Sequence, residues 1–138
     1  MKTRWFVAPT VLVAAITGIL YSQNGGPTSA EIAKLEICVK QGRLPKNQYD
    51  PKTPQWTDFS DISIDKYARY YATENRNGEK VIVGELVGWL DPQESPGIHT
   101  VSDVTQFPKI FDGGCGVVHL VYSIREGTIL AFKCNGRG

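Results

Sequence analysis

The side chains best suited to covalent or acid–base chemistry gather in one short stretch of the sequence. It runs Asp-Gly-Gly-Cys-Gly-Val-Val-His from Asp112 to His119, with Cys115 between them, and His99 precedes it. A thiol can act as a nucleophile when an imidazole lies within hydrogen-bond reach. Asp112, Cys115, His99 and His119 therefore define a candidate pocket. A thiol enzyme or small hydrolase that uses Cys115 with His99 or His119 is the catalytic hypothesis for this chain.

The same stretch resembles the Asp-Cys-Ser-Gly segment that opens the nucleophile helix of the NlpC-related envelope cysteine peptidases. That resemblance implies a Cys115 nucleophile served by a histidine well downstream. The only histidine that follows Cys115 is His119, four residues away. The segment has strand character, and four residues of strand span about 13 Å. We therefore rank the catalytic hypothesis second, and expect His119 on the exposed face of a sheet beside Val117 and Val121.

Other chemistries find little support in the sequence. Two histidines and three cysteines without a close-spaced ligand pair make a weak zinc pattern. Asp58, Asp61 and Asp65 lack the ligand spacing and central glycine of a calcium-binding EF-hand loop. There is no phosphate-binding or dinucleotide-binding glycine motif, and a net charge of +1 argues against a nucleic-acid partner. We expect no catalytic set, no metal and no cofactor.

The three cysteines allow one disulfide and leave one thiol. Cys115 and Cys134 flank the last predicted hairpin, in which Cys134 should lie opposite Val118, three residues from Cys115. Neighbouring glycines could bend the chain to close that gap. We predict a Cys115–Cys134 disulfide, with Cys38 reduced and buried. A bridge between Cys38 and Cys134 stays open as an alternative, because spacing alone does not fix connectivity.

The N-terminus has the pattern of an export signal. Lys2 and Arg4 precede an apolar run, residues 5–20, that no charge interrupts. The pattern predicts a signal peptide or an uncleaved signal anchor over residues 1–22, and the run falls just short of the ~20 residues that span a bilayer. Basic residues held inside would export the remainder of the chain. We expect a location in the bacterial periplasm, at the inner membrane facing the periplasm, or outside the cell.

A polar linker at residues 23–29 separates this segment from an exported domain at residues 30–138. Ser29 could cap a helix over residues 30–41, since apolar residues recur there at helical spacing, at Ile32, Leu35 and Val39. Gly42 is a natural stop.

Four strands are predicted after the helix, at residues 66–73, 79–90, 117–124 and 128–134. An Asn-Gly pair at residues 77–78 and a Gly at 127 mark two hairpin turns. Gly84 and Gly88 alternate with apolar residues and suggest a face that the helix approaches closely. The fold class is therefore α+β, with an N-terminal helix packed on an antiparallel four-stranded sheet of two hairpins. This order of elements is similar to that of cystatin-like domains.

These expectations favour a small, exported, non-catalytic domain of the cell envelope with a binding, inhibitory or accessory role. Its partner would be another envelope protein, and its N-terminal segment would contact the membrane. Besides the catalytic hypothesis, a structural subunit of an envelope complex is a further alternative.

Overall fold

The computed structural model describes residues 25–45, 63–88, 95–111 and 113–135. The predicted signal or anchor segment, residues 1–22, and Asp112 lie outside these residues. Among the helices that the structure describes, none is long and apolar enough to cross a membrane.

The α-helix α1 spans Ser29–Lys40, one residue from the predicted bounds. Its N-cap is Thr28 and not Ser29 as expected. The Thr28 hydroxyl accepts from the Glu31 backbone N–H at 3.2 Å, and the Glu31 carboxylate accepts from the Thr28 backbone N–H at 2.7 Å. This reciprocal capping box satisfies two of the N–H groups that a helix start leaves unbonded. Gly42, with a φ of 65°, ends the helix as predicted.

The sheet has five strands in the order β3-β1-β2-β4-β5. Four of them form two antiparallel hairpins that agree with the prediction: β1 (Ala68–Arg76) with β2 (Glu79–Val87), and β4 (Val117–Ser123) with β5 (Thr128–Cys134). The fifth, β3 (Gly97–Thr100), pairs in parallel with the outer edge of β1. The prediction of a four-stranded antiparallel sheet was therefore wrong, because a stretch expected to be a connection adds a short edge strand.

The two hairpins have the turn and the pairing that the sequence predicts. Asn77 and Gly78 both have positive φ, 53° and 81°, and join β1 to β2 as a two-residue turn. The pairing of β4 with β5 places Cys134 opposite Val118, as predicted. The register of this pair shifts by one residue between Val121 and Tyr122.

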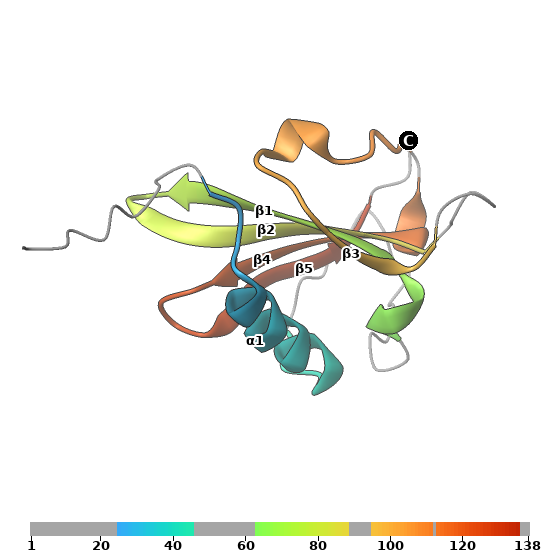
Figure 1. The fold of residues 1–138 in the computed structure, drawn as a ribbon. Coiled ribbons are helices and arrows are strands. Elements are labelled where there is room, and N and C mark those ends of the chain that lie inside the picture. The colour runs from blue at the N-terminus through green and yellow to red at the C-terminus, as the bar shows by residue number, and fades with distance from the viewer. Residues whose placement is uncertain (1–24, 46–62, 89–94, 112, 136–138) are drawn as a thin grey trace, which may run out of the picture.

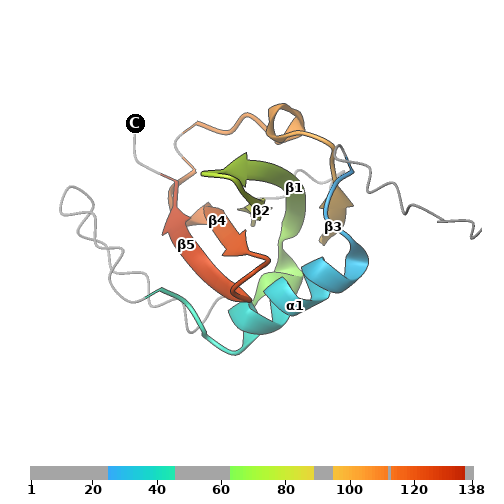
Figure 2. The same ribbon diagram turned by 90° about the vertical axis from the view of Figure 1, so that its left-hand side faces the viewer.

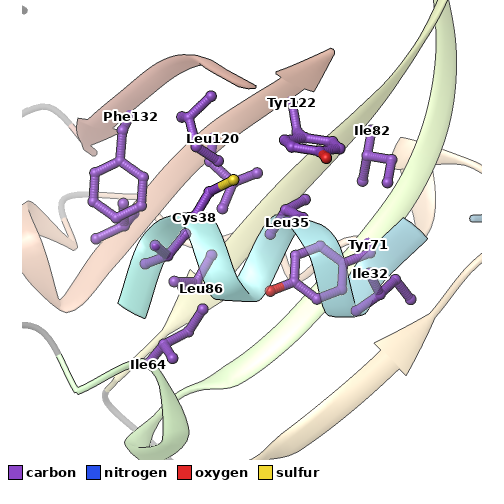
Figure 3. Close-up of a cluster of buried hydrophobic side chains, with 13 residues drawn as sticks. Ile32, Leu35, Cys38, Ile64, Tyr71, Ile82, Leu86, Leu120, Tyr122 and Phe132 are labelled. Carbon is purple, nitrogen blue, oxygen red and sulfur yellow. The ribbon is translucent and has the colours of Figure 1, made fainter. Parts of the chain in front are cut away.

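α1 covers one face of the sheet and forms the core with it (Figures 1 and 2). Figure 3 shows Ile32, Leu35 and Cys38 of α1 among the side chains of the sheet. All of the core residues are at least nine-tenths buried: Ile32, Leu35, Cys38, Val39, Ile64, Tyr71, Ile82, Leu86, Val118, Leu120, Tyr122, Ile129 and Phe132. The prediction that Cys38 is reduced and buried is confirmed.

A buried ion pair fixes α1 against β1. Arg69 Nε lies 3.0 Å from Glu36 Oε1, and the Tyr71 hydroxyl donates to the same carboxylate at 3.2 Å. Arg69 Nη1 also donates to the Ile64 carbonyl at 2.7 Å and contacts the Asp65 carboxylate at 3.3 Å. Burial and the Glu36 charge raise the pKa of Tyr71 far above its usual value, so its hydroxyl stays neutral.

The opposite face of the sheet is only partly covered. Residues 101–111, here called the covering segment, leave β3 and cross this face before the chain enters β4 (Figures 1 and 2). The segment contains the 3-10 turn η3 (Val104–Gln106). The Asn135 side chain, just after β5, donates to the Ile110 carbonyl at 3.0 Å. This bond holds the end of the covering segment at the β5 edge of the sheet, opposite the β3 edge where the segment begins.

Gly84 makes room for an aromatic ring on the helix side. It lies between Tyr71 and Leu120 in the pairing, and a Cβ built on it would come within 2.9 Å of both side chains. At Gly88 a Cβ would come within 2.8 Å of the Tyr67 ring. The close approach expected at these glycines is therefore made by tyrosine rings, and at Gly84 also by a leucine, instead of by the backbone of the helix.

We predict that Gly84→Ala lowers the free energy of unfolding by about 1–3 kcal/mol, because the new methyl group overpacks a filled core. Gly97→Ala, on β3, is the matched control, since no atom lies within 4 Å of its Cβ position. Urea unfolding of both variants measures the difference. Equal midpoints for the two would show that Tyr71 and Leu120 do not constrain Gly84.

Candidate functional site

Five polar or aromatic side chains form one line across all five strands. The pairing places His99 of β3 beside Tyr70 of β1, Tyr70 opposite Glu85 of β2, Glu85 opposite His119 of β4, and His119 opposite Lys133 of β5. Directly paired residues project to the same side of a sheet. These five residues, here called the polar row, therefore share the face opposite α1.

The polar row divides a covered end of this face from an open end. On one side lie Ala68, Val87 and Val117, which are almost completely buried. On the other side Val83, Val121 and Ala131 are paired in line with one another and remain half-buried, whereas Ala72, Val81 and Ser123 of the same face are at most 2% exposed.

One end of the polar row is aromatic. The His99 imidazole stacks on the Tyr70 ring with 4.6 Å between centroids and 15° between planes. The Phe107 ring of the covering segment also contacts the Tyr70 ring, tilted by 56° with 6.5 Å between centroids. These ring contacts help to hold β3 and the covering segment against β1.

Glu85 lies at the centre of the row, and its carboxyl group makes few contacts with other polar groups. Its side chain is 7% exposed. One oxygen, Oε2, lies 3.5 Å from His119 Nδ1, which is long for a hydrogen bond. The other, Oε1, is buried with no hydrogen-bond partner in the described part of the chain. Burial raises the pKa of Glu85 to about 7, because a carboxylate removed from water favours its neutral form.

His119 covers Glu85 from the β4 side and is about one-third exposed. Burial lowers the pKa of this imidazole, and the nearby Lys133 charge lowers it further, while a hydrogen bond with Asn135 opposes both. Near pH 7 the pair therefore consists of a carboxyl group close to its titration midpoint and a largely neutral imidazole. Such a pair can accept or donate a proton at physiological pH.

A hollow of about 400 Å³ lies at the open end of the same face. Its apolar lining comes from Val81, Val121, Leu130 and Ala131. Three polar residues at the β1–β2 turn also line it: Arg76, Asn77 and Glu79. No residue of the polar row lines the hollow, but Val121, which does, lies two positions from His119 on the same face of β4.

The structure separates the two histidines of the predicted pocket and places its cysteine in a disulfide. Cys115 and Cys134 form a disulfide, with a Cα–Cα distance of 4.5 Å, so the predicted pairing is confirmed and the alternative with Cys38 is excluded. His99 and His119 share a row but lie three strand spacings apart, about 14 Å. Asp112 lies outside the described residues. His119 is on the expected face of the sheet.

Glu85 and Tyr70 are the residues that sequence analysis missed. Their importance follows from cross-strand pairing, which the sequence does not display. One signal was available: Glu85 is the only charged residue in the run from Val81 to Val87. A lone carboxylate in an otherwise apolar strand needs a partner or a reason to be there.

The described residues contain no group of three or more His, Cys, Asp or Glu side chains that could hold a metal ion. No family model, curated protein or solved structure matches this chain. The arrangement around Glu85 is therefore the main basis on which a function can be argued.

We predict that Glu85→Gln gains stability relative to the wild type as the pH rises. The pKa of Glu85 is about 7 in the fold and 4.5 in a model peptide, so the folded state keeps a proton that the unfolded chain loses between these values. Wild-type stability then falls across this window, whereas an amide does not titrate. The difference between variant and wild type should grow by up to about 3 kcal/mol from pH 4.5 to pH 7.5.

Urea unfolding at several pH values measures this difference. Glu126→Gln, in the exposed β4–β5 turn, controls for the removal of one carboxylate from the protein. A Glu85→Gln difference that stays constant over the window would show that Glu85 is solvated in the folded state.

Proposed function

We propose that this chain is a small exported domain of the cell envelope that binds a partner and does not catalyse a reaction. The observation that carries the proposal is the bond between Cys115 and Cys134. It consumes the thiol on which the catalytic hypothesis depended, because only a free thiolate is a nucleophile. A structural disulfide also suits an oxidising compartment outside the cytoplasm.

The face opposite α1 is the surface that we assign to binding. It carries Glu85 and His119 on regular strands, where the backbone holds them rigidly, and leaves half-buried apolar residues beside them. The polar row contains an acid and two imidazoles but no serine, threonine or cysteine. Convergent polar groups beside an apolar hollow favour recognition of a ligand.

The proposed cellular setting follows from the first 22 residues. Lys2 and Arg4 before an apolar run favour export of the domain. The segment would hold the domain at the membrane if it is not cleaved, and another envelope protein is the proposed partner.

A reporter enzyme that is active only outside the cytoplasm should be active when fused after Gly138. Removal of residues 1–22 should abolish that activity, because the export signal is lost. Activity of a cytoplasm-specific reporter at the same position would contradict the proposed location.

The state of the cysteines separates the binding hypothesis from the thiol enzyme. Alkylation of the native protein should label no cysteine quickly, since Cys38 is 2% exposed and the other two are bonded. Unfolding without reduction should expose one thiol, at Cys38. Rapid labelling of Cys115 in the native protein would overturn the proposal in favour of the enzyme.

Cys115→Ser should lower the free energy of unfolding by about 3 kcal/mol, because the disulfide closes a loop between residues 19 apart. Cys134→Ser should cost a similar amount and the double variant little more, since all three lose the same bond. Additive costs in the double variant would show that each cysteine stabilises the fold by a separate route.

A further inference from the structure

We propose that Glu85 and the adjoining hollow bind a primary ammonium group carried on a short apolar stem. This inference rests on the proposed binding function and specifies the chemistry of the ligand. The ammonium nitrogen would lie at Glu85, and the stem would run over the half-buried Val83 and Val121 towards the hollow.

The first support is the carboxyl group itself. A buried oxygen without a hydrogen-bond partner destabilises the fold, and a ligand that donates to it removes this cost. Glu85 Oε1 has no such partner among the described residues, and the 3.5 Å contact to His119 leaves Oε2 weakly bonded as well. An ionised carboxylate only accepts hydrogen bonds, whereas an ammonium group donates three. The charge-assisted bond between them is about twice as strong as a neutral one.

The second support is the path from Glu85 to the hollow. Val83 lies two residues before Glu85 on the same face of β2, about 7 Å along the strand, and pairs with Val121 of β4, which lines the hollow. Val121 and Ala131 widen this path on the β4 and β5 side. A stem of four methylenes, like that of a lysine, would bury its apolar surface there while its charged end reaches the carboxylate.

The groups around Glu85 determine how binding depends on pH. Tyr70 faces it from β1 and His119 from β4, with His99 and Lys133 one strand further out on either side. The covering segment carries two charged residues, Asp103 and Lys109, and both are exposed. An ammonium ligand favours ionised Glu85 and neutral His119, so binding should strengthen as the pH rises from 6 to 8.

The test is a titration of the full chain with n-butylammonium chloride, followed by calorimetry and by backbone amide NMR. We expect saturable binding that moves the amide signals of Val83, Glu85, His119 and Val121. Affinity should rise between pH 6 and pH 8. n-Butanol, which has the same stem without the charge, should not bind.

Two variants, Glu85→Gln and Ala131→Leu, localise the site, and a third variant serves as a control. Glu85→Gln should weaken butylammonium binding at least tenfold, whereas Glu126→Gln, in the exposed β4–β5 turn outside the hollow, should leave it within twofold. Ala131→Leu fills the path of the stem without altering the carboxylate and should also weaken binding at least fivefold. The Ala131→Leu variant keeps the test decisive if Glu85→Gln fails to fold.

A tripeptide, acetyl-Gly-Lys-Gly-amide, distinguishes the two sources of an ammonium group. Binding tighter than that of butylammonium identifies a lysine side chain of a polypeptide as the natural ligand. Equal or weaker binding identifies a small amine.

The proposal is overturned if neither butylammonium nor the lysine tripeptide binds saturably, or if butanol binds as well as butylammonium. It is also overturned if the Glu85→Gln and Ala131→Leu variants bind butylammonium like the wild type. Those results would leave the proposed function intact, since the reporter fusion and the thiol measurements test it independently.

Discussion

The buried ion pair between Glu36 and Arg69 is the constraint on which the arrangement of the fold depends. An isolated helix of twelve residues is marginal in water, so α1 owes its stability to the sheet. Apolar contacts with the sheet supply most of that stability. The Glu36–Arg69 contact, with the bonds from Tyr71 and to the Ile64 carbonyl, adds directional contacts that favour one position of the helix. A buried pair of this kind specifies geometry more than it adds stability.

The buried carboxyl groups on the two faces of the sheet differ in the number and kind of their polar partners. On the helix face the carboxylate of Glu36 has a cation and a hydroxyl as partners. On the opposite face the carboxyl of Glu85 has one long contact and an oxygen with no hydrogen-bond partner among the described residues. Arg69 Nε on the helix face also lacks a hydrogen bond there, but it lies 3.0 Å from a carboxylate of opposite charge. Proteins tend to keep such local inconsistencies where function requires them. The missing countercharge at Glu85 is the reason to propose binding on the face opposite α1.

Local signals in the sequence were sufficient for most of the elements. The apolar spacing from Ile32 to Val39 predicted α1, the Asn77–Gly78 pair predicted the first hairpin, and the register of the last hairpin predicted the disulfide. The strand β3 was missed because it has four residues, follows a proline and pairs with a strand almost thirty positions earlier. The contact between Glu85 and His119 was missed for a related reason: it arises from the pairing of β2 with β4, across an intervening strand and a long connection.

The position of the disulfide has a mechanical consequence. β5 lies at an edge of the sheet, and an edge strand pulled from its end separates from its neighbour one hydrogen-bonded pair at a time. Tension applied at the C-terminus would begin this peeling at Cys134. Cys134 is covalently joined to Cys115, two residues before β4, so the load passes to a strand that is paired on both sides. Peeling from this end therefore requires that β4 separate from β2 as well, and the disulfide protects the edge strand against fraying.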